Sequence, residues 1–349
     1  MKKTLIIILT ILIATPFVFF LNHAYHRSSK QKLYLLIWSD YIKTDLIEEF
    51  RIQHDCEMII DTYDSNESMY AKLKFGSGNY DIVIPSGYFM EMMNEQGMLT
   101  PIDHSRLPNL KNLDPEYINP IAPELLKIGV PYMISIAGVA YRKDKVSEIE
   151  DSWDVFNDSK YRGRMTMLND VRETIGAALI FLGYSVNSVD PDEIDHAVET
   201  IIQWKRNLAK FESEQYKSGI ASGEFLVVSG YNGDTLQVIQ ENPNVDFFFP
   251  REGTAIAIDF LTIPKEAPNP ELAYALIDYL LDGSVAAENM KTTFFFTPNL
   301  AAYDLLPEEL KTNPLLFIPE KIRKKATLIR YQGKKGIIYN KAWNKIKGA

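Results

Sequence analysis

The chain has 349 residues, 46% of them hydrophobic and 24% charged, and its formal net charge is −9. This apolar content excludes a disordered chain, and the length suits about two domains. The acidic balance disfavours nucleic acid, whose phosphates are held by clustered lysine and arginine, and it modestly favours a cationic ligand. The single cysteine, Cys56, excludes an intrachain disulfide, and we expect a partly buried, inert thiol there.

The N-terminus carries the signature of export. Lys2 and Lys3 precede an apolar run over residues 4–21. A charged start followed by an apolar segment is typical of a signal peptide, although this run is also long enough to span a bilayer. We therefore expect residues 1–24 to be a signal peptide or an uncleaved N-terminal membrane anchor, and the remainder to be periplasmic.

From residue 33 onward, short apolar runs alternate with amphipathic helical patterns. The first part of the chain predicts strands at 33–38, 58–61 and 80–85 and helices at 45–54 and 67–75. This β-α-β-α-β succession indicates a largely parallel sheet.

The alternation continues along the rest of the chain. Strands are predicted at 138–141, 164–167, 225–229, 245–249 and 255–263, and helices at 174–182, 193–208, 235–241 and 270–281. The fold class is therefore α/β, and the chain is too long for one simple sheet. We expect two lobes with a cleft between them.

Standard catalytic signatures are absent from the sequence. There is no GxGxxG motif or P-loop, the five histidines lack metal-binding spacing, and Ser86 lies in Pro-Ser-Gly-Tyr rather than GxSxG. We expect no catalytic residue, no metal and no cofactor.

Aromatic residues recur beside carboxylate or hydroxyl residues just after predicted strands. These segments are Trp38-Ser39-Asp40-Tyr41, Ser86-Gly87-Tyr88, residues 169–173, Tyr231-Asn232-Gly233-Asp234 and Asp259. In open α/β sheets, ligands bind beyond the carboxyl ends of the strands. Aromatic faces attract alkylammonium groups, and carboxylates add charge-assisted hydrogen bonds. The pattern suits a slender molecule with ammonium ends.

Each of these residues also has a purely structural interpretation. Asp170 and Glu173 have the spacing of a helix capping box, and Trp38 and Tyr41 could be ordinary core or rim aromatics. Asp259 lies inside an apolar strand, where a carboxylate is costly unless it is paired. It therefore indicates a binding site or a buried ion pair.

Several longer blocks carry a family resemblance. They are residues 61–73 (Asp-Thr-Tyr-Asp-Ser-Asn-Glu-Ser-Met-Tyr-Ala-Lys-Leu), residues 80–86, 112–115, 130–132, 170–173, 183–185, 250–253 and 297–301. In these blocks the chain resembles the periplasmic spermidine/putrescine-binding proteins of ABC importers, over nearly all of residues 33–349.

The resemblance implies a type II periplasmic-binding-protein fold, with two α/β lobes joined by a hinge. Lobe 1 would comprise residues 31–135 plus 258–305, and lobe 2 residues 136–257 plus 306–349. It further implies a monomer that captures a polyamine and delivers it to a permease pair in the inner membrane, served by a cytoplasmic ATPase. No enzymatic activity is implied.

The resemblance also implies a binding site. The expected ligand-binding residues are Trp38, Ser39, Tyr41, Ser86, Tyr88, Asp170, Glu173, Tyr231, Asp259, Phe295 and Gln332. Asp259 would hold one ammonium group, and Asp170 and Glu173 would hold the other end of the ligand, assisted by Gln332.

The chain departs from the family pattern at three aromatic positions. Tyr231 stands where the family usually has tryptophan, Ala257 where it has a large aromatic residue, and Phe295 where it has tyrosine. The wider wall at Ala257 favours spermidine over putrescine. Lys334 and Lys335 follow Gln332, and we expect both to be solvated.

Three alternatives remain open at this point. The long apolar run at residues 4–21 favours a membrane-tethered polyamine sensor. Asp170 and Glu173 could instead form the acid/base pair of a hydrolase. The altered aromatic residues could also suit a different cation, or an anion, on the same fold.

Overall fold

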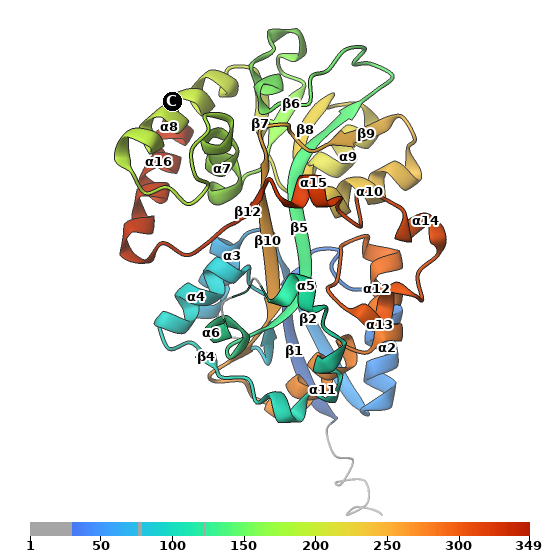
Figure 1. Ribbon diagram of the computed structural model, residues 1–349. Helices are drawn as coiled ribbons and strands as arrows, with labels where there is room; N and C mark the ends of the chain where they lie inside the picture. The colour runs from blue at the N-terminus through green and yellow to red at the C-terminus, as the bar shows by residue number, and fades with distance from the viewer. Residues whose placement is uncertain (1–29, 76–78, 120, 122) are drawn as a thin grey trace, which may run out of the picture.

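The computed structural model describes residues 30–75, 79–119, 121 and 123–349. The segment 1–24, predicted to be a signal peptide or anchor, lies outside these residues. Within them, no helix is both long enough and apolar enough to span a bilayer. The elements gather into two α/β lobes, one above the other, and the chain ends in the upper one (Figure 1).

The lower lobe contains a parallel sheet of order β2-β1-β3. Its strands are β1 (Gln31–Trp38), β2 (Cys56–Tyr63) and β3 (Ile82–Val83). The helices of this lobe are α2 (Thr44–Gln53), α3 (Asn66–Phe75), α4 (Gly87–Glu95), α5 (Pro115–Ile118), α6 (Pro123–Leu126), α11 (Pro270–Leu280), α12 (Gly283–Thr293) and α13 (Leu300–Tyr303). Successive residues of β1 are buried, as expected for a parallel strand covered on both faces.

The upper lobe is built on a mixed sheet of order β12-β10-β5-β8-β6-β7, in which β9 also pairs with β5. The strands confined to this lobe are β6 (Met165–Met167), β7 (Leu208–Phe211), β8 (Val227–Tyr231), β9 (Val245–Phe248) and β12 (Ala326–Leu328). Its helices are α7 (Val171–Phe181), α8 (Pro191–Lys205), α9 (Tyr216–Ser222), α10 (Asn232–Glu241) and α16 (Ile337–Gly348).

Two long strands run from one lobe into the other. They are β5 (Val130–Arg142) and β10 (Thr254–Leu261), which pair antiparallel with Ile136 opposite Ile256. The sequence predicted only residues 138–141 of β5. The strand begins eight residues earlier. Those residues were not predicted because almost the whole strand is buried, so it lacks the alternation of polar and apolar residues by which a half-buried strand is detected.

A third connection runs through α14 (Glu308–Lys311) and α15 (Glu320–Arg323) before β12 joins β10. The chain remains against the lower lobe beyond residue 305, because the Phe317 ring packs on Phe296 and Tyr303. Arg323 then pairs with Glu116 on α5. The chain thus enters the upper lobe later than the boundary expected at residue 306.

Most predicted elements are present, with ends shifted by a few residues. Among them are α2, α3, α7, α8, α11, β1 and β9. The main differences are β3, which is only two residues long, and the helices α4, α12 and α16, which were not predicted. The α4 and α12 helices each begin at a glycine, a residue that usually indicates a turn.

The close approach of β9 to β5 provides a test of this packing. A methyl group added at Gly138 would lie 2.4 Å from Phe247 Cζ and 2.7 Å from the carbonyl oxygen of Phe248. We expect Gly138→Ala to lower the free energy of unfolding by about 1–3 kcal/mol, measured by urea titration. Gly336→Ala is the control, since its methyl would meet only Gln332 Cβ at 3.6 Å. Equal stability of the two variants would contradict the packing.

Candidate functional site

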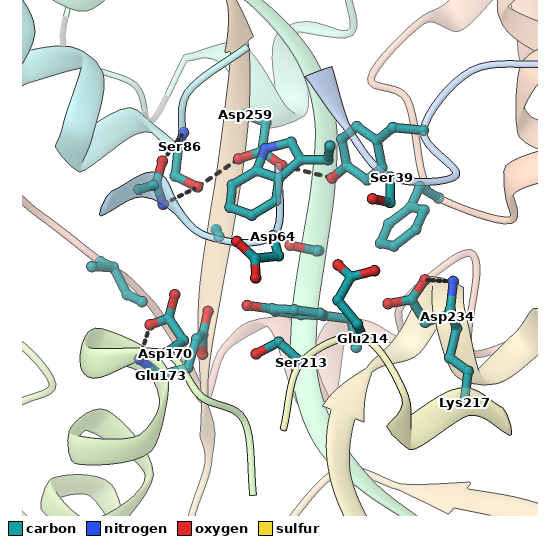
Figure 2. Close-up of a pocket in the computed structure, with 18 of the residues that line it drawn as sticks. Ser39, Asp64, Ser86, Asp170, Glu173, Ser213, Glu214, Lys217, Asp234 and Asp259 are labelled. Carbon is teal, nitrogen blue, oxygen red and sulfur yellow. Dashed lines mark hydrogen bonds and ion pairs between the residues drawn. The ribbon is translucent and has the colours of Figure 1, made fainter. Parts of the chain in front are cut away.

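A pocket lies where the two lobes meet (Figure 2). It holds about 780 Å³ of atom-free space, including its open mouth. Its lining residues are Trp38, Ser39, Tyr41, Asp64, Asn66, Ser86, Tyr88, Ser135, Asp170, Glu173, Ser213, Glu214, Lys217, Tyr231, Asp234, Ala257, Asp259, Phe295 and Ile329. Both lobes and both crossing strands contribute.

Asp259 anchors the wall formed by the lower lobe. The hydroxyl of Tyr41 donates to its Oδ2 at 2.6 Å, and the hydroxyl of Ser86 donates to its Oδ1 at 2.7 Å. The carboxylate is buried on β10, where the register with β5 shifts just after it. Burial raises the pKa of Asp259 to about 6, against the two hydrogen bonds, which lower it.

Asn66 positions this wall, although the sequence analysis did not single it out. Its Nδ2 lies 3.3 Å from Ser86 Oγ and 3.3 Å from the Tyr88 hydroxyl oxygen, and its Oδ1 accepts from the Ser86 backbone N–H. Asn66 is fully buried at the start of α3. The sequence feature that could have identified Asn66 is its position in the family block 61–73, shortly after the end of β2.

Asp170 and Glu173 form part of the opposite wall, at the start of α7. Asp170 caps the helix, since its Oδ1 accepts from the backbone N–H groups of Arg172 and Glu173. The capping interpretation therefore holds for Asp170, and both side chains also line the pocket. Oδ1 makes both capping bonds, so the second oxygen, Oδ2, is left for other contacts.

Glu173 is the electrostatically strained member of this pair. Its Oε2 is buried without a hydrogen-bond partner in the described part of the chain. Burial, reinforced by the neighbouring Asp170 charge, raises the pKa of Glu173 to about 8, and burial also raises the pKa of Asp170. A cation between these groups would relieve both effects.

Aromatic rings complete the walls. Trp38 packs on Tyr63 with ring centroids 4.5 Å apart, and Tyr41 packs on Phe295 at 4.7 Å. Tyr231 lies at the end of β8, where the chain enters α10. At the third departure from the family pattern, Ala257 faces the pocket opposite Ser135 of β5 and leaves that wall without a ring.

The pocket is also lined by four charged residues that were not among the expected ligand-binding residues. Asp64 follows β2, Glu214 follows β7, and Asp234 lies in the first turn of α10. The rule that ligands bind beyond strand ends could have identified Asp64 and Glu214. Lys217, on α9, also lines the pocket and had no comparable signal.

The pocket brings together all but one of the expected ligand-binding residues. Gln332 does not line it, because its amide turns back to donate to the carbonyl oxygen of Arg330 at 3.3 Å. We therefore leave Gln332 out of the candidate site. Lys334 and Lys335 are exposed, as expected.

Acidic residues therefore outnumber basic ones around an aromatic-walled space, which suits an organic cation. In the described ranges, no cluster of histidine, cysteine and acidic side chains is arranged to hold a metal ion.

The fold and the pocket together define a solute-binding protein. Residues 45–318 match the family described as bacterial extracellular solute-binding proteins, and the chain belongs to this family. The expected resemblance is thereby confirmed.

Relatives of known name cover almost the whole chain. The chain is 34% identical to the spermidine/putrescine-binding periplasmic protein of Salmonella typhimurium over 326 residues, 93% of this chain and 94% of the relative. It is 33% identical over 338 residues to the putrescine/cadaverine-binding protein of Pseudomonas aeruginosa, covering 93% of this chain and 96% of that protein.

Solved structures confirm the expected fold. The Tp0655 (TpPotD) lipoprotein of Treponema pallidum superposes with a TM-score of 0.82 at 33% identity, over 90% of this chain and 99% of that one. The spermidine/putrescine ABC transporter substrate-binding protein PotD from Streptococcus pneumoniae gives a TM-score of 0.77 at 29% identity, over 91% and 99%.

The raised pKa of Glu173 makes stability depend on pH. Between its ordinary pKa of 4.5 and about 8, the folded chain retains a proton that the unfolded chain releases, so stability falls as pH rises through this window. Glu173→Gln removes this loss. We expect the variant to exceed the wild type in unfolding free energy by about 1–3 kcal/mol near pH 8.5, and by much less near pH 5.

Denaturant titration at both pH values measures this difference. Glu199→Gln is the control. Because Glu199 is exposed on α8, we expect this substitution to change the unfolding free energy little at either pH value. A Glu173→Gln variant that is less stable than the wild type near pH 8.5 would show that the carboxylate stabilises the fold.

Proposed function

We propose that this chain binds a small polyamine outside the cytoplasm and delivers it to an ABC importer. The observation that carries the proposal is the pair of buried acidic sites, Asp259 on one wall and Asp170 with Glu173 on the other, separated by aromatic rings. Relatives named for spermidine, putrescine and cadaverine binding support it.

Each end of such a ligand meets a prepared group. Tyr41 and Ser86 donate hydrogen bonds that orient the Asp259 carboxylate, and this carboxylate could pair with an ammonium group of the ligand. An ammonium group would favour its ionised form and lower its pKa, so binding would release protons wherever the carboxylate is partly protonated. Aromatic faces would hold the methylene chain between the charged ends.

The remaining parts of the proposal concern location and partners. We propose a periplasmic monomer whose lobes are residues 31–135 plus 258–325 and 136–257 plus 326–349, with the last boundary moved from residue 306 because Phe317 and Arg323 contact the lower lobe. Its partners would be a pair of permease subunits and a cytoplasmic ATPase. We propose no catalytic step, because one oxygen of Asp170 is committed to capping α7 and Glu173 sits beside it rather than across from it.

Calorimetric titration of residues 25–349 tests the function directly. The ligands are putrescine, spermidine, a neutral amino acid and phosphate. We expect saturable binding of the polyamines alone. Tight binding of the amino acid or phosphate, with no polyamine signal, would contradict the proposal.

Asp259 provides the sharpest single test of the site. Asp259→Asn keeps groups that Tyr41 and Ser86 can hydrogen-bond, so the fold should survive, but it removes the charge facing the ligand. We expect polyamine affinity to fall by about 2–4 kcal/mol, roughly 30- to 1,000-fold. The control is Asp45→Asn, which changes net charge equally at an exposed position on α2. Equal affinities of the two variants would remove Asp259 from the site.

Binding should also close the lobes. The pocket walls belong to different lobes, which are joined by β5, β10 and the third connection through α15, and such connections permit hinge bending. We expect small-angle scattering to give a smaller radius of gyration with saturating polyamine than without it. Superimposable curves, with binding verified on the same sample, would argue for a rigid pocket.

A further inference from the structure

Lys217 is the basic residue among those that line the pocket. It lies on α9 of the upper lobe, and its side chain is only 20% exposed. Its Nζ is 2.8 Å from Asp40 Oδ2, just after β1 in the lower lobe, and 3.3 Å from Asp234 Oδ1. One ammonium group thus sits inside a pocket that is otherwise rich in carboxylates, and it bridges the two lobes.

The Asp234 carboxylate is fully engaged by its neighbours. Its Oδ2 accepts from the hydroxyl of Tyr216 at 2.5 Å, while its Oδ1 faces Lys217. The Asp234 side chain is 14% exposed. Because Lys217 is held by two acids, the raising effect of Asp234 and Asp40 on its pKa outweighs the lowering effect of burial, and the amine remains charged. A ligand ammonium would find Asp234 already neutralised.

The Lys217–Asp234 ion pair lies at one end of the pocket, where it would limit the length of a bound polyamine. Figure 2 shows Asp170 and Glu173 on one side of the pocket and Asp234 with Lys217 on the opposite side. Asp64 and Glu214 lie between them. A ligand held between Asp259 and the pair Asp170 and Glu173 would need a carboxylate partner for any further ammonium group, and on the far side of the pocket Lys217 already pairs with Asp234.

We propose that Lys217 is a specificity-determining residue, whose ammonium group takes the place of a ligand ammonium beside Asp234 and so favours a diamine over a triamine. This inference rests on the proposed polyamine-binding function. The absent ring at Ala257 acts in the opposite sense, since it widens one wall. The ion pair outweighs the missing ring, because a third ammonium group would find no free carboxylate at Asp234, whereas a missing ring changes affinity by about 2- to 30-fold.

Titration of one lysine variant against two ligands tests the inference. Lys217→Met keeps a long side chain of similar shape but removes the charge. Lys210→Met is the matched control, because Lys210 lies in the same lobe, pairs with Glu212 at 2.8 Å and does not line the pocket. Both variants lower the net charge by one, so their long-range effect on a cationic ligand is the same. Lys217→Arg, which retains the charge, is the conservative variant.

In calorimetry, we expect the wild type to bind putrescine more tightly than spermidine. Lys217→Met should gain at least about tenfold in spermidine affinity and change by less than about threefold for putrescine. Lys210→Met and Lys217→Arg should keep the wild-type preference. Thermal unfolding of each variant, followed by circular dichroism, confirms that the compared proteins are folded.

Other outcomes would distinguish a failure of the proposed Lys217 role from a failure of polyamine binding itself. A wild type that binds spermidine about tenfold more tightly than putrescine, or a Lys217→Met variant that shifts both ligands equally, overturns the role of Lys217 and leaves polyamine binding intact. A folded wild type that binds neither polyamine overturns the proposed function, and the inference with it.

Discussion

The structure depends on a buried carboxylate held from two sides. Asp259 accepts hydrogen bonds from Tyr41 and Ser86, which lie 218 and 173 residues away in the sequence. An unpaired charge at this depth would be costly, and the two hydroxyl groups offset part of that cost by stabilising the ionised carboxylate. The segments after β1 and β3 are thereby fixed against β10, and they form one wall of the pocket.

The opposite wall contains two buried carboxyl groups, Asp170 and Glu173, whose ionisation is unfavourable unless a cation is bound beside them. Asp170 and Glu173 are both buried beside the same space, where burial raises the pKa of each and the Asp170 charge further raises the pKa of Glu173. Such a pair lowers stability in the absence of a cation and gains most when one arrives. The crossing strands β5 and β10 hold this wall opposite Asp259, so the two acidic sites are spaced by the sheet rather than by a flexible loop.

Local patterns explain why some elements were predicted and others were not. The α7 helix was predictable because its apolar residues follow Asp170, which caps it. By contrast, β3 is limited to Ile82–Val83. Its neighbour Asp81 turns its carboxylate to the backbone N–H groups of Tyr34 and Asn269, a long-range contact that no local pattern reveals. The full extent of β5 was hidden for a related reason, since uninterrupted burial removes the alternation that identifies a strand.

The sequence by itself determined the fold class, the solute-binding family and most of the residues that line the pocket, because strand ends and family blocks are local features. Tertiary structure alone decided that Gln332 turns away, that Asn66 braces Ser86, and that Lys217 enters an acidic pocket. Lys217 meets Asp40 across 177 residues of chain, and nothing in its helix indicates that partner. The charge balance of the pocket follows from contacts between lobes, which a linear pattern does not encode.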